Sequence, residues 1–247
     1  MAKKSRAAER NARAARAAAA MKEQQRQEKR RRNFMIGGVV LVVLVIIAGG
    51  YFLSRSLDTT TDVAAPATGS KYGLTIGSSD APHQVVIYED FLCPFCGEFE
   101  KATRDDLSQL ADDGKVTVEY RPFELLSTLG DYSARSAEAF SIVMDKSGPD
   151  VAKKFHDLLY ENQPSEKGPF LSNEDMLKLA VQAGANESDV KTAITNADGN
   201  APWVEGATQA ALDAGVRGTP TILLDGSVWQ EGSTPEEMGQ KLIDQLS

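Results

Sequence analysis

Two different patterns of apolar residues divide the chain. Residues 34–53 form an almost continuous apolar run without a charged side chain. Its 20 residues match the length at which an α-helix crosses ~30 Å of hydrocarbon. From residue 71 onward, short apolar runs and helix-spaced apolar positions alternate with polar segments. The pattern predicts one transmembrane helix followed by a globular domain over 71–247.

The first part of this domain has the order strand, helix, strand. Residues 84–91, QVVIYEDF, are a compact run of β-forming residues, typical of a buried strand. A helix predicted to end near Gly114 follows, and residues 115–125, KVTVEYRPFEL, alternate as a second strand. Residues 71–77, KYGLTIG, fit a short edge strand. A βαβ unit of about 40 residues predicts parallel strands joined by a right-handed crossover.

The middle of the domain has a helical pattern, and its end returns to strands. Pro149 suits the first turn of a helix, and Ser172 with Asp175 forms a capping-box pattern. TPTILLDG and SVWQEG then predict two short strands that turn at Asp225–Gly226, before a final helix. The order βαβ…ββα, with a helical insertion at about 127–200, predicts an α/β fold.

Charge is distributed unevenly between the two ends. Residues 1–32 carry 12 Lys and Arg against three Glu, a net charge of +9, so the remainder carries −17. An excess of Lys and Arg beside a membrane span marks its cytoplasmic side. We therefore expect a basic cytoplasmic tail at 1–33, a transmembrane signal anchor at 34–53, a flexible Ser/Thr/Ala/Asp-rich linker at 54–70 and an extracytoplasmic domain.

Three other interpretations of the apolar run fit it less well. A cleaved signal peptide has an apolar core of ~7–15 residues and a small-residue cleavage site, whereas this run is longer and lacks that site. A lipoprotein would need a cysteine to acylate directly after the run, and none is present there. Twenty uncharged residues next to KRRR are atypical of a buried helix. The sequence thus predicts a single-pass cell-membrane protein whose domain lies where disulfides persist.

The only two cysteines, Cys93 and Cys96, lie in the motif CPFC. A structural staple across this spacing would close almost no loop and gain little. A metal clip needs about four ligands, and only His83 and His156 could add imidazole. We interpret both histidines as structural or solvated, and we predict no metal site. A reversible redox pair, with no cofactor besides its own disulfide, fits the pattern best.

The position of the pair at a predicted helix start indicates different roles for its sulfurs. Cys93 at the N-cap would have a lowered pKa because unpaired N–H groups and the helix dipole favour a thiolate. Cys96, one turn later and more buried, would be the resolving thiol. Pro94 suits the first turn. Two hypotheses remain open for Glu89 and Asp90. One of these acids is partly buried near Cys96 and relays its proton, or both are exposed residues at the end of the strand.

A second motif, GVRGTPTILL, places a proline directly before a buried strand. Proline cannot donate to the strand ladder and marks a bend there. A cis Thr219–Pro220 bond would expose the Thr219 backbone beside the sulfurs, although only about 5–6% of X–Pro bonds are cis.

With CPFC after an apolar strand, then helices, then GTP before a strand, residues 71–247 resemble the thioredoxin superfamily. The context YEDFLCPFCGEF resembles its DsbA-like branch, in the membrane-anchored form of Gram-positive and actinobacterial envelopes. The resemblance implies that Cys93 is the nucleophile, Cys96 the resolving cysteine and Thr219–Pro220 a cis-proline loop. It also implies oxidation of secreted or cell-envelope proteins, with reoxidation by a membrane quinone-linked partner. We expect a monomer that does not bind nucleic acid.

Phe95 departs from the strongest oxidases of that branch, which carry a histidine before the second cysteine. A phenyl ring offers no positive charge to a thiolate, so we expect a milder oxidant. Two other functions remain open on the sequence. One is a reductase or isomerase that delivers electrons to extracytoplasmic disulfides, and the other is a membrane-tethered binding module whose cysteines are vestigial.

Overall fold

The computed structural model describes residues 69–247. The predicted cytoplasmic tail, the signal anchor and nearly all of the linker lie outside the described residues. Within residues 69–247, no helix is both long enough and apolar enough to cross a membrane.

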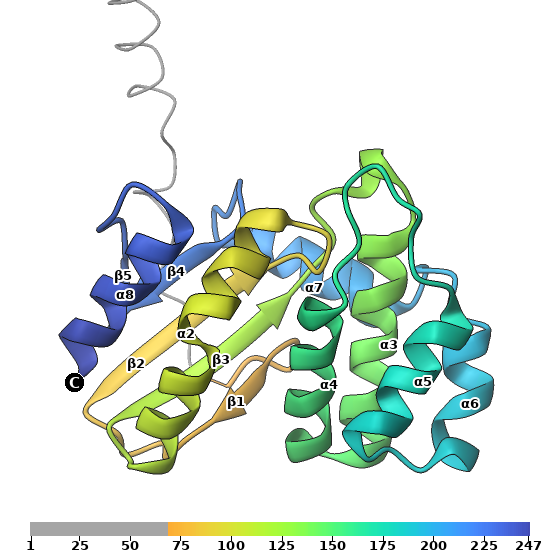
Figure 1. Ribbon diagram of the computed structural model, residues 1–247, viewed down its shortest axis with the longest axis horizontal. Coiled ribbons are helices and arrows are strands. Elements are labelled where there is room, and N and C mark those ends of the chain that lie inside the picture. The colour runs from red at the N-terminus through yellow and green to blue at the C-terminus, as the bar shows by residue number, and fades with distance from the viewer. Residues whose placement is uncertain (1–68) are drawn as a thin grey trace, which may run out of the picture. The chain divides into compact units, whose positions relative to one another are not determined.

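A five-stranded sheet forms the centre of the domain, in the order β1-β3-β2-β4-β5 (Figure 1). The strands are β1 (Leu74–Ile76), β2 (His83–Glu89), β3 (Val116–Pro122), β4 (Thr221–Leu224) and β5 (Ser227–Val228). β2 and β3 are parallel, as the βαβ pattern predicts, and the other neighbours are antiparallel. β1 lies at the edge, as its sequence also predicts.

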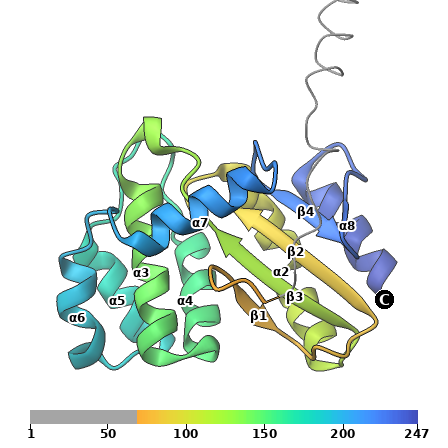
Figure 2. The ribbon, with the colours of Figure 1, turned by 180° about the vertical axis from the view of Figure 1, so that it is seen from behind.

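Helices cover both faces of the sheet. α2 (Pro94–Asp112) and α8 (Pro235–Leu246) lie together on one face (Figure 1), and α7 (Pro202–Asp213) crosses the other (Figure 2). Alternate residues of β2 supply the two cores. Val85 and Ile87 pack on the α2 side, whereas Val86 and Tyr88 pack on the α7 side. Because β2 is buried on both faces, its sequence is a continuous apolar run.

Four helices form an insertion between β3 and α7. They are α3 (Tyr132–Ser147), α4 (Pro149–Glu161), α5 (Asn173–Ala183) and α6 (Glu187–Thr195), and a short 3₁₀ turn (Ser127–Leu129) precedes them. Pro149 begins α4, and the capping box of Ser172 and Asp175 begins α5, as their sequence patterns predict. The α/β fold with a helical insertion is therefore confirmed.

The hairpin between β4 and β5 turns at Asp225–Gly226. Both residues have positive φ, 50° and 79°, as a type I′ turn requires. The Asp225 side chain accepts from the backbone N–H of Gln84 at 2.8 Å, so the turn is also attached to β2.

Candidate active site

The turn between β2 and α2 places Cys93 at the start of a helix. β2 ends at Glu89, and α2 begins at Pro94 with Cys93 as its N-cap residue. No side chain caps this helix start. The backbone N–H groups of Phe95 and Cys96 instead interact with the Cys93 sulfur. Pro94 fits here because the N–H that it lacks would have no helical partner.

The structure brings CPFC and the GTP segment together, although they are 126 residues apart. Sγ of Cys93 lies 3.3 Å from the carbonyl oxygen of Thr219. The Thr219–Pro220 peptide is cis. Both cysteines are free thiols, with Cys93 5% exposed and Cys96 1% exposed. The sulfur nearer to solvent is thus the one that faces the Thr219 backbone.

The surroundings separate the two thiols in acidity. The hydrogen bond with the Cys96 thiol, the side chain of Thr219 and the N–H groups of the first turn lower the pKa of Cys93 to about 6, against the effect of burial. Burial, together with the nearby Cys93 and Glu89, raises the pKa of Cys96 well above its usual value. At neutral pH one thiolate is favoured, and it is that of Cys93.

The two residues between the cysteines face solvent. Pro94 is exposed, and Phe95 is 57% exposed. Phe95 is therefore an exposed apolar side chain within the cysteine motif. No cationic side chain occupies this position of the motif.

The interpretation of Glu89 and Asp90 as exposed strand-end acids is wrong, because neither side chain has any exposed surface. Glu89 continues the alternation of Val85 and Ile87 along β2, so its side chain enters the core on the α2 side. Burial raises the pKa of Asp90, although backbone N–H donors partly offset this.

Asp90 holds the loops around the active site in place. Its Oδ1 accepts from the N–H of Leu92 at 2.8 Å. Its Oδ2 accepts from the N–H groups of Leu125 and Leu126 at 2.8 and 2.9 Å. Both carboxylate oxygens are therefore committed to backbone groups, which indicates a positioning role for Asp90 and leaves Glu89 as the better relay candidate.

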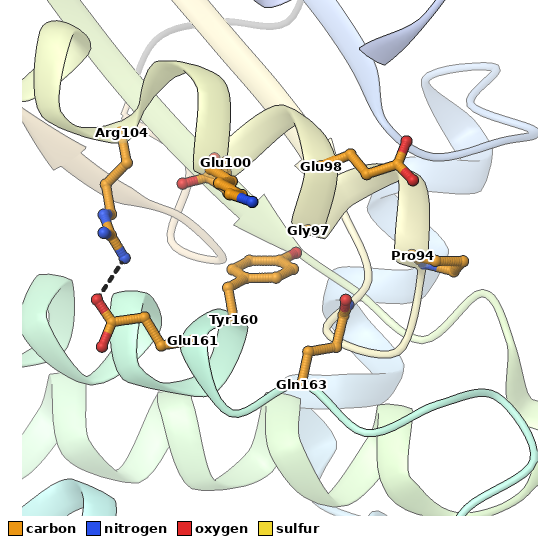
Figure 3. Close-up of a pocket in the computed structure, with 9 residues that line it drawn as sticks. Pro94, Gly97, Glu98, Glu100, Arg104, Tyr160, Glu161 and Gln163 are labelled. Atoms are coloured by element: carbon orange, nitrogen blue, oxygen red, sulfur yellow. Dashed lines mark hydrogen bonds and ion pairs between the residues drawn. The ribbon is translucent and has the colours of Figure 1, made fainter. Parts of the chain in front are cut away.

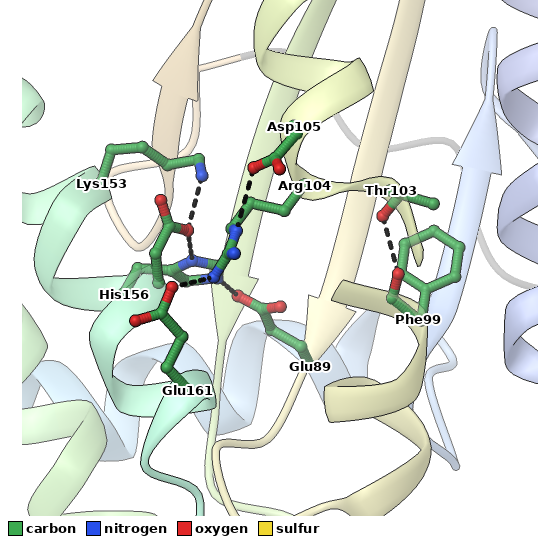
Figure 4. A network of polar contacts seen from close by, with 9 residues as sticks. Glu89, Phe99, Thr103, Arg104, Asp105, Lys153, His156 and Glu161 are labelled. Atoms are coloured by element: carbon green, nitrogen blue, oxygen red, sulfur yellow. Dashed lines mark hydrogen bonds and ion pairs between the residues drawn. The ribbon is translucent and has the colours of Figure 1, made fainter. Parts of the chain in front are cut away.

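Glu89 belongs to a buried charge network with α4 (Figure 4). Nε2 of His156 donates to Oε1 of Glu89 at 2.8 Å, and Nδ1 donates to Asp157 at 3.0 Å. Lys153 also donates to Asp157, at 2.6 Å. Burial alone would lower the pKa of His156, but Glu89 and Asp157 outweigh it and raise the pKa to about 10. His156 is thus a buried cation, so of the two interpretations given for it, structural or solvated, the solvated one is wrong.

Glu100 lies beside this network with both carboxylate oxygens buried and without a hydrogen-bond partner in the described structure. It follows Cys96 by one turn of α2, so the two side chains share a helix face. Burial, and then the nearby Glu89, raises the pKa of Glu100 to about 7. Among the residues that the structure describes, Oε2 of Glu89 likewise has no hydrogen-bond partner. A nearby carboxylate disfavours a second negative charge, so Glu89 favours the protonated form of Glu100.

A cleft of about 610 Å³ opens onto this region between α2 and the end of α4 (Figure 3). Glu100 and Tyr160 line it, and an ion pair of Arg104 with Glu161 at 2.7 Å closes one side. The cleft therefore gives solvent a route toward Glu100.

Within residues 69–247, one group of side chains has donor atoms close enough to hold a metal ion. The atoms belong to Glu89, Glu100 and His156 and lie within 4.8 Å of one another. Nε2 of His156, the atom that would bind the metal, already donates to Glu89. In this arrangement His156 and Glu89 form an ion pair beside the buried carboxyl group of Glu100.

Sequence reasoning missed His156 and Glu100 as parts of the site, and spacing carries a signal for each. His156 lies midway between Ala152 and Tyr160 at four-residue steps, which places all three on one face of α4. Glu100 occupies the same relation to Cys96 on α2. His156 and Glu100 therefore lie on the buried faces of their helices. A buried charged side chain is costly unless it is paired with an opposite charge or neutralised by a change of protonation.

Comparisons with known proteins agree with this geometry. The sequence profile of the family described as Thioredoxin matches residues 69–245. The crystal structure of reduced DsbA from Mycobacterium tuberculosis is 31% identical, with a TM-score of 0.58, over 71% of this chain and 92% of the other. A probable disulfide bond formation protein D from Bacillus cereus is 29% identical over 118 residues, which are 47% of this chain and 52% of the relative.

A more distant similarity is to a longer protein. The serine/threonine-protein kinase PknE of Mycobacterium tuberculosis is 26% identical over 164 residues. The match covers 63% of this chain but only 29% of the kinase, so the similarity concerns one part of that protein.

Proposed function

We propose that this chain, which belongs to the thioredoxin family and within it to the DsbA-like thiol–disulfide oxidoreductases, introduces disulfides into secreted or cell-envelope proteins through Cys93 and Cys96. Cys93 is the sulfur that exchanges with the client, and Cys96 is the resolving sulfur. Thr219 and Pro220 form the loop beside which the client backbone lies, supported by the 3.3 Å contact between Cys93 Sγ and the Thr219 carbonyl.

Oxidation of a client proceeds in two thiol–disulfide exchange steps. A client thiolate attacks Sγ of Cys93 in the oxidised enzyme, the Cys93–Cys96 bond breaks, and Cys96 leaves as a thiolate that takes up a proton. A second client thiolate attacks the client sulfur of the mixed disulfide and releases Cys93 as a thiolate. The client loses two electrons and two protons, and the enzyme retains the two electrons as reduced Cys93 and Cys96.

The observation that carries the proposal is the difference in acidity between the two sulfurs. A pKa of about 6 makes Cys93 a good leaving group and favours the reduced enzyme, which strengthens it as an oxidant. Cys96 has a raised pKa and must be protonated as it leaves. The buried carboxyl group of Glu100, whose pKa is raised to about 7 with Glu89 beside it, supports a role for these two residues in relaying the proton.

The cellular setting is part of the same proposal. The charge-free run at 34–53 beside a basic tail supports a membrane anchor that holds the domain outside the cytoplasm. The reduced pair returns its two electrons to a membrane quinone-linked partner, and the protein acts as a monomer.

The reduction potential of the pair tests the direction of electron flow. The full-length protein would be equilibrated in glutathione redox buffers and the free thiols trapped and counted. A reduction potential of about −120 mV would support an oxidase. A reduction potential of about −270 mV would instead support the hypothesis that the protein is a reductase.

A further inference from the structure

Gln163, in the loop that follows α4, makes a direct contact with the backbone of the Cys93 turn. Its Nε2 donates to the carbonyl oxygen of Phe91 at 2.9 Å and to that of Cys93, also at 2.9 Å. A carbonyl can only accept, so the atom that faces both carbonyls is the amide nitrogen. Both N–H bonds of the side chain are therefore used on the two carbonyls that flank Leu92.

The carbonyl of Cys93 accepts the hydrogen bonds that close the first turn of α2. It accepts from the N–H of Cys96 at 3.1 Å and from that of Gly97 at 3.2 Å, in addition to Gln163. The N–H groups of this same turn lower the pKa of Cys93. A side chain that fixes the Cys93 carbonyl thus also fixes the donors that stabilise the Cys93 thiolate.

Gly97 provides independent support, because its lack of a side chain makes room for Gln163. A Cβ at residue 97 would lie 2.4 Å from Oε1 of Gln163 and 3.1 Å from its Cδ. The backbone at Gly97 is helical, so no unusual φ angle demands glycine there, and glycine inside a helix is otherwise unfavourable. Figure 3 shows the Gln163 side chain directed from its loop toward Gly97 and Pro94.

The backbone of Gln163 is itself anchored. Its N–H donates to the carbonyl of Tyr160 in the last turn of α4 at 3.2 Å. Tyr160 packs on Phe91 with ring centroids 5.2 Å apart. The Tyr160–Phe91 contact and the two hydrogen bonds of Gln163 therefore join the end of α4 to the turn before α2.

We propose that Gln163 is a positioning residue for Cys93, which sets the reactivity of the thiolate through the Cys93 carbonyl, and that Gly97 is its matched partner. The inference deepens the proposed function, since it concerns the same sulfur. It does not depend on the direction of electron flow, because a thiolate pKa can be measured without a client.

The test measures the alkylation of Cys93 by iodoacetamide against pH in the reduced full-length protein, with the labelled peptide quantified by mass spectrometry. Gln163→Ala should slow alkylation at pH values below the wild-type pKa by about three- to tenfold, as expected for the loss of hydrogen bonds of ordinary strength. Gln163→Glu should slow it further near neutral pH, because a carboxylate places acceptors against two carbonyls. That additional effect should disappear as the new carboxyl group is protonated.

A second variant, Gly97→Ala, is tested in the same assay. It should reproduce the effect of Gln163→Ala in the wild-type background and add little in the Gln163→Ala background, where the side chain that it displaces is gone. Asn162→Ala is the control, because the side-chain amide of the neighbouring Asn162 donates to the Leu158 carbonyl of α4, at 2.9 Å. Thermal unfolding of each variant identifies any that has lost its fold.

An unchanged Cys93 pKa in a folded Gln163→Ala protein would overturn the inference, as would an equal shift in Asn162→Ala. A shifted pKa in Gln163→Ala, combined with a reducing potential of the wild type, would refute the oxidase and leave the role of Gln163 standing.

Discussion

Nε2 of His156 donates to Oε1 of Glu89 at 2.8 Å, although His156 belongs to the helical insertion and Glu89 ends the central strand. Neither side chain has exposed surface. A buried ion pair costs desolvation of both groups, but loss of one partner leaves a buried charge uncompensated. The pair therefore makes correct docking of α4 on β2 a condition of stability.

The first prediction concerns this pair. Glu89→Gln should destabilise the protein by about 3 kcal/mol near neutral pH, because His156 loses its closest counter-charge. The folded pKa of His156, about 10, lies above the usual imidazole value. The stabilisation is then complete below about pH 6.5 and declines as the pH rises toward that folded pKa.

Urea unfolding of wild type and variant from acid to alkaline pH measures this difference. Glu161→Gln is the control, because it breaks the half-exposed pair with Arg104, which should contribute less than about 1 kcal/mol. Equal losses in the two variants at every pH would contradict the prediction.

The second prediction concerns Glu100. Its folded pKa of about 7 lies above the usual value of 4.5, so its ionisation destabilises the fold progressively between these two values. Glu100→Gln should leave stability unchanged in acid and raise it by about 1–3 kcal/mol above neutral pH. The exposed Glu98 on the same helix gives the matched control, Glu98→Gln, which replaces a glutamate that is not buried. A uniform loss of stability in Glu100→Gln would show that the carboxyl group has another partner.

The third prediction compares the two redox states. The depressed pKa of Cys93, about 6, stabilises the reduced fold fully above the usual thiol pKa of about 8.5, and this contribution is lost as the pH falls through the folded value. The difference in unfolding free energy between reduced and oxidised protein should therefore shift in favour of the oxidised form on acidification. Denaturant titrations of both forms across this range measure it. A constant difference would mean that the Cys93 thiolate is not stabilised.

The fourth prediction assigns the roles of the sulfurs. In Cys96→Ala, a mixed disulfide between Cys93 and a client or a model peptide cannot be resolved within the enzyme, so it should accumulate. Non-reducing electrophoresis followed by mass spectrometry detects the adduct. Cys93→Ala serves as the comparison and should form much less, because Cys96 is 1% exposed. The opposite order of adduct formation would reverse the assignment.

The fifth prediction concerns Phe95, the exposed aromatic residue of the motif. Phe95→His places a group that can become cationic beside the Cys93 thiolate, so it should make the pair more oxidising by at least ~30 mV, a tenfold change in the exchange equilibrium. Glutathione equilibration measures the potential. Phe95→Leu separates the effect of charge from the loss of the ring. A Phe95→His protein no more oxidising than the wild type would show that the histidine substitution alone does not set the oxidising strength.

The order of strands and helices could be predicted because each element carries its own local pattern. Pro149, the capping box at Ser172 and the turn at Asp225–Gly226 act within a few residues, so the sequence displays them directly. The CPFC motif and the strand before it likewise fixed the position of Cys93 at a helix start.

The support beneath the cysteines could not be predicted in the same way. Glu89 and His156 are 67 residues apart, and Gln163 reaches Cys93 across 70. Strand alternation gives the face on which Glu89 lies, but not the histidine that meets it there. The contacts depend on how α4 docks against the sheet, which is a tertiary property with no local signature.

The path of α4 also has a consequence for protein engineering. This helix and the loop after it carry His156, Tyr160 and Gln163, which contact the end of β2 and the turn that holds Cys93. The helical insertion is therefore not an interchangeable module. A chimera that joins this sheet to the insertion of another relative would retain its redox chemistry only if the donor helix carried compatible groups at all three positions.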